Sequence, residues 1–166
     1  MLGPKPALTG KTQLSSDAVV LDVPFESQKA ADLCGIAVLN MLTEYYGKKL
    51  DPDQAAILFR EAKEKGGVSG ASLKEALKVS GYTAVIFPGS LERGTAGLYD
   101  HLDRKRPLIV MVGGGQRHYL VVIGYDSERE NLVVLDPAKG RHIFPLEAFS
   151  EEWRKANNFT LLATPN

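Results

Sequence analysis

The sequence has only one cysteine, Cys34, among its 166 residues. A single cysteine cannot form a disulfide within the chain, and metal sites that are built on several cysteines are excluded with it. The sequence also has no net charge, because 20 Lys and Arg residues balance 20 Asp and Glu residues. A general binder of nucleic acid or of anionic membranes would carry a basic excess. We therefore expect no nucleic-acid partner.

Long hydrophobic runs are missing as well. No stretch reaches the roughly 20 apolar residues that span a bilayer, so we expect no integral membrane segment. Residues 1–17 are polar, carry Pro4 and Pro6 and lack the apolar core of a signal peptide, which predicts a flexible leader. Residues 18–166 show no internal repeat and are expected to form one domain. The compartment stays open, because a targeting segment can be removed from a mature protein.

The first half of the sequence is predicted to be mainly helical. The apolar run from Leu33 to Tyr46 predicts a buried helix that Gly47 ends. Asp51 as N-cap, with Pro52 at the first helical position, begins a second helix that ends after Lys65. Three further helices are expected, over residues 72–79, 95–104 and 146–153.

The second half changes to short β-rich runs separated by turn residues. A short edge strand is expected at residues 18–23, and later strands at residues 82–87, 107–112, 119–124, 131–135, 141–144 and 159–163. Residues 126–131 are predicted to form a hairpin loop. Helices that come first and strands that come later indicate an α+β fold, with an antiparallel sheet packed on the buried helix.

Cys34 stands where the buried helix begins. Unpaired backbone N–H groups and the positive end of the helix dipole favour a thiolate over a thiol there. Such positions lower a cysteine pKa from about 8.5 to roughly 3.5–7.5, and the thiolate is the nucleophile. Taken alone, a cysteine on an apolar helix is more often an inert core residue. A catalytic interpretation therefore requires a base elsewhere in the chain.

His118 and Asp136 provide a candidate base and its orienter. His118 precedes the strand YLVVIG, and Asp136 ends the strand NLVVL. If these strands are antiparallel neighbours, the start of one lies beside the end of the next. A carboxylate there can hold one ring nitrogen while the other faces the thiol. The alternatives are a solvent-exposed histidine and a structural Asp-Pro turn, whereas His101 and His142 are both expected at the surface.

Several smaller features surround these residues. Gln28 lies six residues before Cys34, and its amide is expected to join the Cys34 backbone N–H in an oxyanion hole, where one donor contributes about 2.7–4 kcal/mol in the transition state. Gly35 is expected to leave room for substrate beside the nucleophile. Gly114 and Tyr119 are further candidate substrate-binding residues, and the glycines of residues 113–115 form either a mobile loop or a lid.

The ordered motifs resemble those of the peptidase C39 family of bacteriocin-processing, papain-like cysteine peptidases. The matching pieces lie within residues 20–162 and are Val23-Pro24 with Gln28, Asp32-Leu33-Cys34-Gly35, Tyr45-Tyr46-Gly47, His118-Tyr119 before Val121-Val122, and Asp136-Pro137. The resemblance implies a papain-like α+β fold and an enzyme that uses no metal and no organic cofactor. It also implies Cys34 as nucleophile, His118 as base, Asp136 as orienter and Gln28 as oxyanion donor.

The best-known members of this family cut leader peptides after a double glycine and are fused to a membrane transporter. This chain is more similar to the free-standing C39-like proteins, which are often exported or lipid-anchored. We therefore expect a monomeric peptidase that hydrolyses a peptide or protein substrate through an acyl-enzyme. Two alternatives use the same residues. One is an acyltransferase, in which an amine replaces water, and the other is a catalytically silent peptide-binding module with an ordinary Cys34 thiol.

Overall fold

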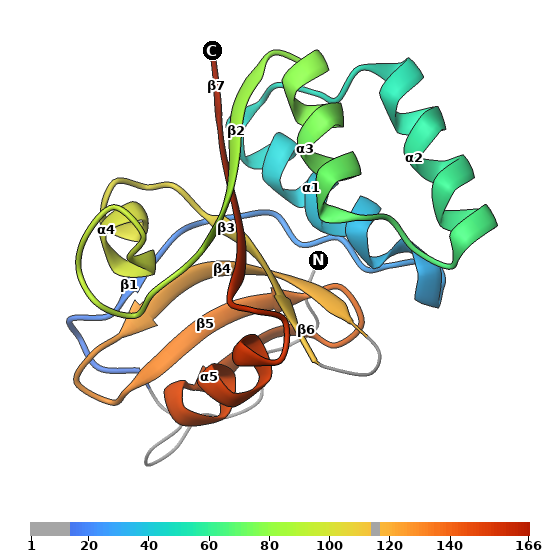
Figure 1. Ribbon diagram of the computed structural model, residues 1–166. Helices are drawn as coiled ribbons and strands as arrows, with labels where there is room; N and C mark the ends of the chain where they lie inside the picture. The colour runs from blue at the N-terminus through green and yellow to red at the C-terminus, as the bar shows by residue number, and fades with distance from the viewer. Residues whose placement is uncertain (1–13, 114–116) are drawn as a thin grey trace.

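The computed structural model describes residues 14–113 and 117–166 (Figure 1). The helices of these residues are α1 (Cys34–Tyr46), α2 (Pro52–Lys65), α3 (Gly70–Val79), α4 (Leu98–Asp103) and α5 (Leu146–Arg154), and a 3-10 turn, η2 (Ala31–Leu33), leads directly into α1. The strands are β1 (Val19–Val20), β2 (Tyr82–Pro88), β3 (Leu108–Val112), β4 (His118–Asp126), β5 (Asn131–Asp136), β6 (Gly140–Pro145) and β7 (Phe159–Pro165).

The strands of the described residues form one antiparallel sheet. Its order is β2-β7-β3-β4-β5-β6, and β1 pairs with β4 off this path. The α+β fold is therefore confirmed, with helices first and most strands later. Asp126 pairs with Asn131 at the end of the β4–β5 hairpin, where a turn was predicted. The strand predicted over residues 18–23 is reduced to the two residues of β1, which pair only with the far end of β4.

Helices cover both faces of the sheet. Figure 1 shows α1, α2 and α3 on one side and α5 on the other, with α4 at one end. Alternate residues of β4 divide between two cores because successive strand side chains point to opposite faces. Val121 packs in the core that contains α1, and Leu120 packs with Phe149 and Trp153 of α5. A strand buried on both faces reads as a continuous apolar run, which explains the sequence of β4.

The local signals for the first two helices are confirmed. Most of α1 is buried, and it ends at Gly47, whose φ of 70° is the left-handed conformation that glycine adopts without strain. The Asp51 side chain accepts a hydrogen bond from the backbone N–H of Gln54 (3.3 Å), so it caps α2 as expected. The turn between these helices contacts the end of α3 and the start of β2, because the Asp51 backbone N–H donates to Ser80 Oγ (2.8 Å) and the Tyr82 hydroxyl donates to the Lys48 carbonyl (2.5 Å).

One histidine prediction is wrong. His101 was expected at the surface of a polar helix, but it is only 8% exposed. The helix begins later than predicted, at Leu98, and the preceding loop folds back so that the Thr95 carbonyl lies 2.8 Å from His101 Nε2. This loop and Phe87 of β2, whose ring centroid lies 6.1 Å from that of His101, cover the histidine. His142 lies half-buried in β6, which is an edge strand as expected.

Two predictions fall partly or wholly outside the described residues. Gly114 is one, and residues 1–13 of the expected leader are the other. Within that leader, Ser15 donates hydrogen bonds from its backbone N–H and its Oγ to Asp126 (2.6 and 2.7 Å), so this point is held against the end of β4. None of the helices in residues 14–113 and 117–166 has both the length and the apolar character needed to cross a bilayer.

Candidate active site

His118 and Asp136 come together because β4 and β5 are antiparallel neighbours. Val121 pairs with Leu135, and continuing this register places Asp136 opposite Leu120, two residues along from His118. Positions 118, 120 and 136 then share one face of the sheet, since side chains alternate with a period of two. His118 Nε2 and Asp136 Oδ1 are 2.6 Å apart. Asp136 Oδ1 also accepts a hydrogen bond from the Ala138 backbone N–H (2.8 Å), which holds the carboxylate in place.

Cys34 is the first residue of α1. The Leu33 side chain provides no cap, so the leading turn of the helix is left without a side-chain hydrogen-bond acceptor. The Cys34 thiol instead hydrogen-bonds to the His118 ring and to the backbone N–H groups of Tyr119 and Gly35. Because His118 Nε2 is held by Asp136, its Nδ1 is the ring nitrogen available to Cys34. The expected order of thiol, imidazole and carboxylate is therefore present in space.

The pKa values of these three groups shift in a way that favours charge separation. Burial would raise the pKa of Cys34, but its hydrogen bonds to His118 and to Tyr119 N–H, together with the His118 charge, lower it overall. The hydrogen bond to Asp136, and then that to Cys34, raise the pKa of His118 to about 9. Burial would also raise the pKa of Asp136, yet the His118 hydrogen bond keeps it below its usual range. These shifts all favour a thiolate beside an imidazolium over the neutral pair.

The missing side chain at Gly35 makes room for other residues of this protein, Val68 and Tyr119. A Cβ atom on Gly35 would overlap Val68 Cγ2 and would lie 3.3 Å from the Tyr119 ring. Tyr119 is 4% exposed, and its hydroxyl donates a hydrogen bond to the Val68 carbonyl (2.9 Å). The loop between α2 and α3 is thereby tied to β4 beside Cys34. The space that was predicted for substrate beside Gly35 is occupied by Val68 and the Tyr119 ring.

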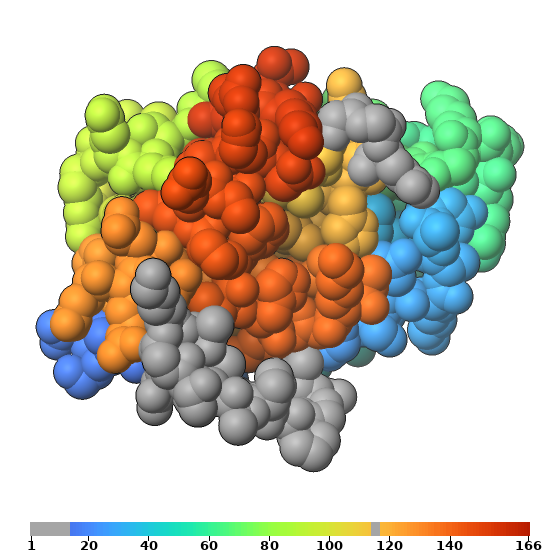
Figure 2. Space-filling view, turned by 90° about the horizontal axis from the view of Figure 1, so that it is seen from below, coloured from blue at the N-terminus to red at the C-terminus, as the bar shows by residue number. Residues whose placement is uncertain are grey.

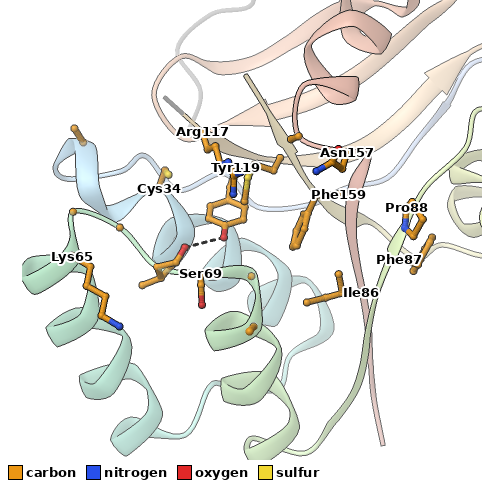
Figure 3. A pocket seen from close by; sticks show the side chains of 18 residues that line it. Cys34, Lys65, Ser69, Ile86, Phe87, Pro88, Arg117, Tyr119, Asn157 and Phe159 are labelled. Atoms are coloured by element: carbon orange, nitrogen blue, oxygen red, sulfur yellow. Dashed lines mark hydrogen bonds between the residues drawn. The ribbon is translucent and has the colours of Figure 1, made fainter. Parts of the chain in front are cut away.

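A groove of about 790 Å³ opens from Cys34 toward β2 and β7. Figure 3 shows Tyr119 and Phe159 between Cys34 on one side and Ile86, Phe87 and Pro88 of β2 on the other. The residues 66–70 of the α2–α3 loop form one wall. Lys65 and Arg117 are the cations of its lining, and the described residues that line it include no Asp or Glu. This groove is large enough to hold several residues of an extended peptide.

A second cavity, of about 620 Å³, lies on the other side of the Cys34–His118 contact. It is lined by Gln28, His118 and Asp136, by the β5–β6 hairpin and by Glu152 of α5, and it shares Ala31 and Arg117 with the first groove. Figure 2 shows the light-blue segment before α1 beside the orange β5–β6 hairpin on this face. The two are joined where the Gln28 backbone N–H donates to the Pro137 carbonyl (2.8 Å). We refer to these two spaces as the Cys34 groove and the His118 pocket.

The Gln28 side chain faces the His118 pocket, but its amide already has a partner. Gln28 Nε2 donates to the Ala30 carbonyl (3.1 Å), and its buried Oε1 has no hydrogen-bond partner among the described residues. An amide nitrogen carries two hydrogens, so this bond leaves the second one available. The structure therefore brings Gln28 to the site through the Pro137 contact without a direct bond to Cys34.

Two site features were not predicted from the sequence. Gly66 and Gly67 were interpreted only as a helix stop and residues 68–70 were not considered, although residues 66–70 form the wall of the Cys34 groove. Arg117 and Lys139, which line the His118 pocket, were not singled out either. Arg117 directly precedes His118 and Lys139 follows Asp136 by three residues, and this closeness in sequence could have identified both. Among residues 14–113 and 117–166 there is no group of three or more His, Cys, Asp and Glu side chains that could hold a metal ion.

The sequence matches a known family model. The model, described as the Peptidase_C39 like family, matches residues 20–160. A curated relative is the Lactococcin-G-processing and transport ATP-binding protein LagD of Lactococcus lactis subsp. lactis, with 25% identity over 120 residues. The match covers 72% of this chain but only 16% of LagD, so the chain spans a small part of that protein's length.

Solved structures with a similar fold include peptidase domains. The peptidase domain of Streptococcus ComA, a bi-functional ABC transporter involved in a quorum sensing pathway, superposes with a TM-score of 0.70 and 25% identity, covering 87% of this chain and 100% of that one. A double glycine motif protease from an AMS/PCAT transporter, in complex with its leader peptide, gives a TM-score of 0.66 and 21% identity over 89% of this chain and 94% of that one. The papain-like fold is shared with both.

Proposed function

Because the chain belongs to the Peptidase_C39 like family, which makes it a cysteine-type peptidase, we propose that Cys34, His118 and Asp136 are its catalytic triad. The single observation that carries this proposal is the 2.6 Å contact of His118 with Asp136 on a ring that also interacts with the Cys34 thiol. A thiol with an ordinary pKa would favour a silent binding module instead. The lowered pKa of Cys34 supports an activated nucleophile.

The reaction follows from these groups. The Cys34 thiolate attacks the carbonyl carbon of a peptide bond, and the His118 imidazolium gives its proton to the leaving amine as the C–N bond breaks. His118, now neutral, takes a proton from water, which attacks the thioester and releases the acid. The proton taken from water makes His118 an imidazolium again, and the Cys34 thiolate leaves as the thioester C–S bond breaks. Asp136 holds the ring in one orientation throughout and stabilises its charged form.

Gln28 is the proposed oxyanion donor. The Pro137 carbonyl fixes its backbone at the edge of the His118 pocket, and its amide keeps one N–H beyond the bond to Ala30. In this role the amide donates to the oxygen of the tetrahedral intermediate. Loss of one such donor slows an acyl-transfer reaction by a factor of about 10² to 10³.

We propose a peptide as the substrate, lying across the Cys34 groove and the His118 pocket. The supporting observation is that the two spaces, of about 790 and 620 Å³, meet at the Cys34–His118 contact. A similar fold is known in complex with a leader peptide. A chain that extends through both spaces would present its backbone carbonyl to Cys34 and its leaving nitrogen to His118.

The test is cleavage of a mixed peptide library by the chain and by Cys34→Ala, with products identified by mass spectrometry. We expect the parent chain to cut and the variant to be inactive, while circular dichroism and thermal melting show that the variant keeps its fold. Parent chain alkylated at Cys34 with iodoacetamide is the matched control and should also be inactive. Cleavage that persists in Cys34→Ala would exclude Cys34 as the nucleophile.

A further inference from the structure

The positions of Cys34 and His118 assign a direction to the substrate. The acyl group becomes bonded to the Cys34 sulfur, whereas the leaving amine must receive its proton from the His118 ring. Cys34 lines only the first groove, and His118 and Asp136 line only the second pocket. The residues that precede the scissile bond therefore occupy the Cys34 groove, and those that follow it occupy the His118 pocket.

The His118 pocket is electropositive. Among the described residues, its cations outside any ion pair are Arg117 and Lys139, and the His118 imidazolium is balanced by Asp136. It contains two carboxylates, and both are already paired: Asp136 with His118 (2.6 Å) and Glu152 with Lys155 (2.7 Å). Within the described part of the chain, the side chains of Arg117 and Lys139 make no ion pair. The ring of His142 completes the titratable lining.

Lys139 lies in a turn whose backbone is held by two hydrogen bonds to Asp136. Its backbone N–H donates to the Asp136 carbonyl (3.0 Å), and the preceding residue, Ala138, donates to the Asp136 side chain (2.8 Å). The hydrogen bonds that orient the His118–Asp136 pair thus also fix the point from which Lys139 extends. Arg117 is adjacent to His118 and lines both spaces, so it lies at their junction, whereas Lys139 lines only the pocket for the leaving half of the substrate.

We propose that the His118 pocket recognises a carboxylate in the leaving half of the substrate, carried by an Asp or Glu just after the scissile bond. This specificity rests on the proposed peptidase function. A carboxylate there completes ion pairs for Arg117 and Lys139, whereas a lysine would meet two like charges. The Cys34 groove also carries two cations, Lys65 and Arg117, but aromatic and apolar side chains such as Tyr119, Phe159 and Ile86 make up most of its lining.

The direct test measures binding of leaving-half mimics and does not require turnover. Three amidated tripeptides, Ala-Asp-Ala, Ala-Asn-Ala and Ala-Lys-Ala, are titrated into the isotope-labelled chain, and affinities are taken from NMR chemical shifts. We expect the acidic peptide to bind on the order of tenfold more tightly than the basic one, as exposed ion pairs of modest strength predict. The difference should shrink as salt is added, because exposed charges are screened.

Two charge-reversal variants test whether the preference for the acidic tripeptide depends on Lys139. Lys139→Glu should remove or invert the preference for the acidic tripeptide. Lys78→Glu, which makes the same charge change on α3 at an exposed position that lines neither cavity, should keep it. Equal binding of the three peptides, or a preference that survives Lys139→Glu, would overturn the proposal.

Cleavage of the mixed library separates this proposal from the proposed function. Enrichment of Asp and Glu in the first positions after the cut, lost in Lys139→Glu, supports both. Cleavage without any such enrichment leaves the peptidase function standing and overturns the specificity. If the acidic tripeptide binds through Lys139 but no peptide is cut, the hydrolytic role of Cys34 fails and the carboxylate site remains.

Discussion

The Tyr119 hydroxyl donates a hydrogen bond to the Val68 carbonyl at 2.9 Å, across 51 residues of sequence. The same tyrosine gives its backbone N–H to the Cys34 thiol. One residue thus fixes both the nucleophile and the wall of the groove beside it. The wall is therefore held to β4 beside the sulfur by Tyr119, in addition to the bond from the Ser69 backbone N–H to Glu61 of α2 (2.9 Å).

Replacing Tyr119 with Phe removes this hydroxyl and leaves the Val68 carbonyl buried without its partner. We expect the free energy of unfolding to fall by about 1–3 kcal/mol and KM for peptide substrates to rise several-fold, with a smaller change in kcat. Denaturant unfolding and steady-state kinetics measure the two effects. Tyr82→Phe is the matched control, because the Tyr82 hydroxyl donates to the Lys48 carbonyl (2.5 Å) away from both cavities. It should lose stability without a change in KM; a rise in KM equal to that of Tyr119→Phe would contradict the wall's role.

The pH dependence of kcat/KM should show an alkaline limb near pH 9. The active form needs the Cys34 thiolate and the His118 imidazolium together. As pH rises, Cys34 loses its proton first because its pKa is lowered, and His118 loses its proton through its pKa of about 9. Activity is then lost because no proton remains for the leaving amine. Iodoacetamide alkylation of Cys34 should reach its plateau below the pH of an ordinary thiol and should not fall at pH 9. An alkylation profile centred at the ordinary thiol pKa would contradict the ion pair.

Asp136→Asn should shift this alkaline limb to lower pH. The hydrogen bond to Asp136 is the largest cause of the raised pKa of His118, and an amide does not stabilise the imidazolium as a carboxylate does. We expect kcat to fall on the order of a hundredfold, as for loss of effective general acid catalysis. An NMR titration of the His118 ring, in the parent chain and in the variant, measures the change in pKa directly. An unchanged His118 pKa would show that Asp136 does not stabilise the charged ring.

Gly35→Ala is expected to destabilise the chain, although alanine is normally the better helix former. The added methyl group would overlap Val68 Cγ2, and overpacking of this kind costs about 1–3 kcal/mol. Thermal or urea unfolding gives the loss. Adding Val68→Ala to the same chain should restore much of it, since the smaller side chain makes room. A neutral or stabilising effect of Gly35→Ala alone would show that Val68 moves aside at no cost.

Much of the site was predictable because its signals are local. The helix start at Cys34, the glycine that ends α1 and the Asp51 cap each depend on residues within one turn. The pairing of His118 with Asp136 needed one assumption, that two consecutive strands are antiparallel neighbours, and the short hairpin between them makes it true. His101 was misplaced because its burial depends on a loop that folds back over it.

The sequence by itself determined the α+β class, the placement of the only cysteine at the head of a buried helix, and the two strand ends that carry His118 and Asp136. Periodicity and turn residues act over a few positions and can be read without coordinates. The tertiary structure decided that Val68 fills the space beside Gly35, that Tyr119 holds the wall of the groove, and that Lys139 lines the same pocket as Arg117. These contacts depend on how the helical layer and the hairpin pack on the sheet, and packing of residues distant in sequence leaves no local pattern.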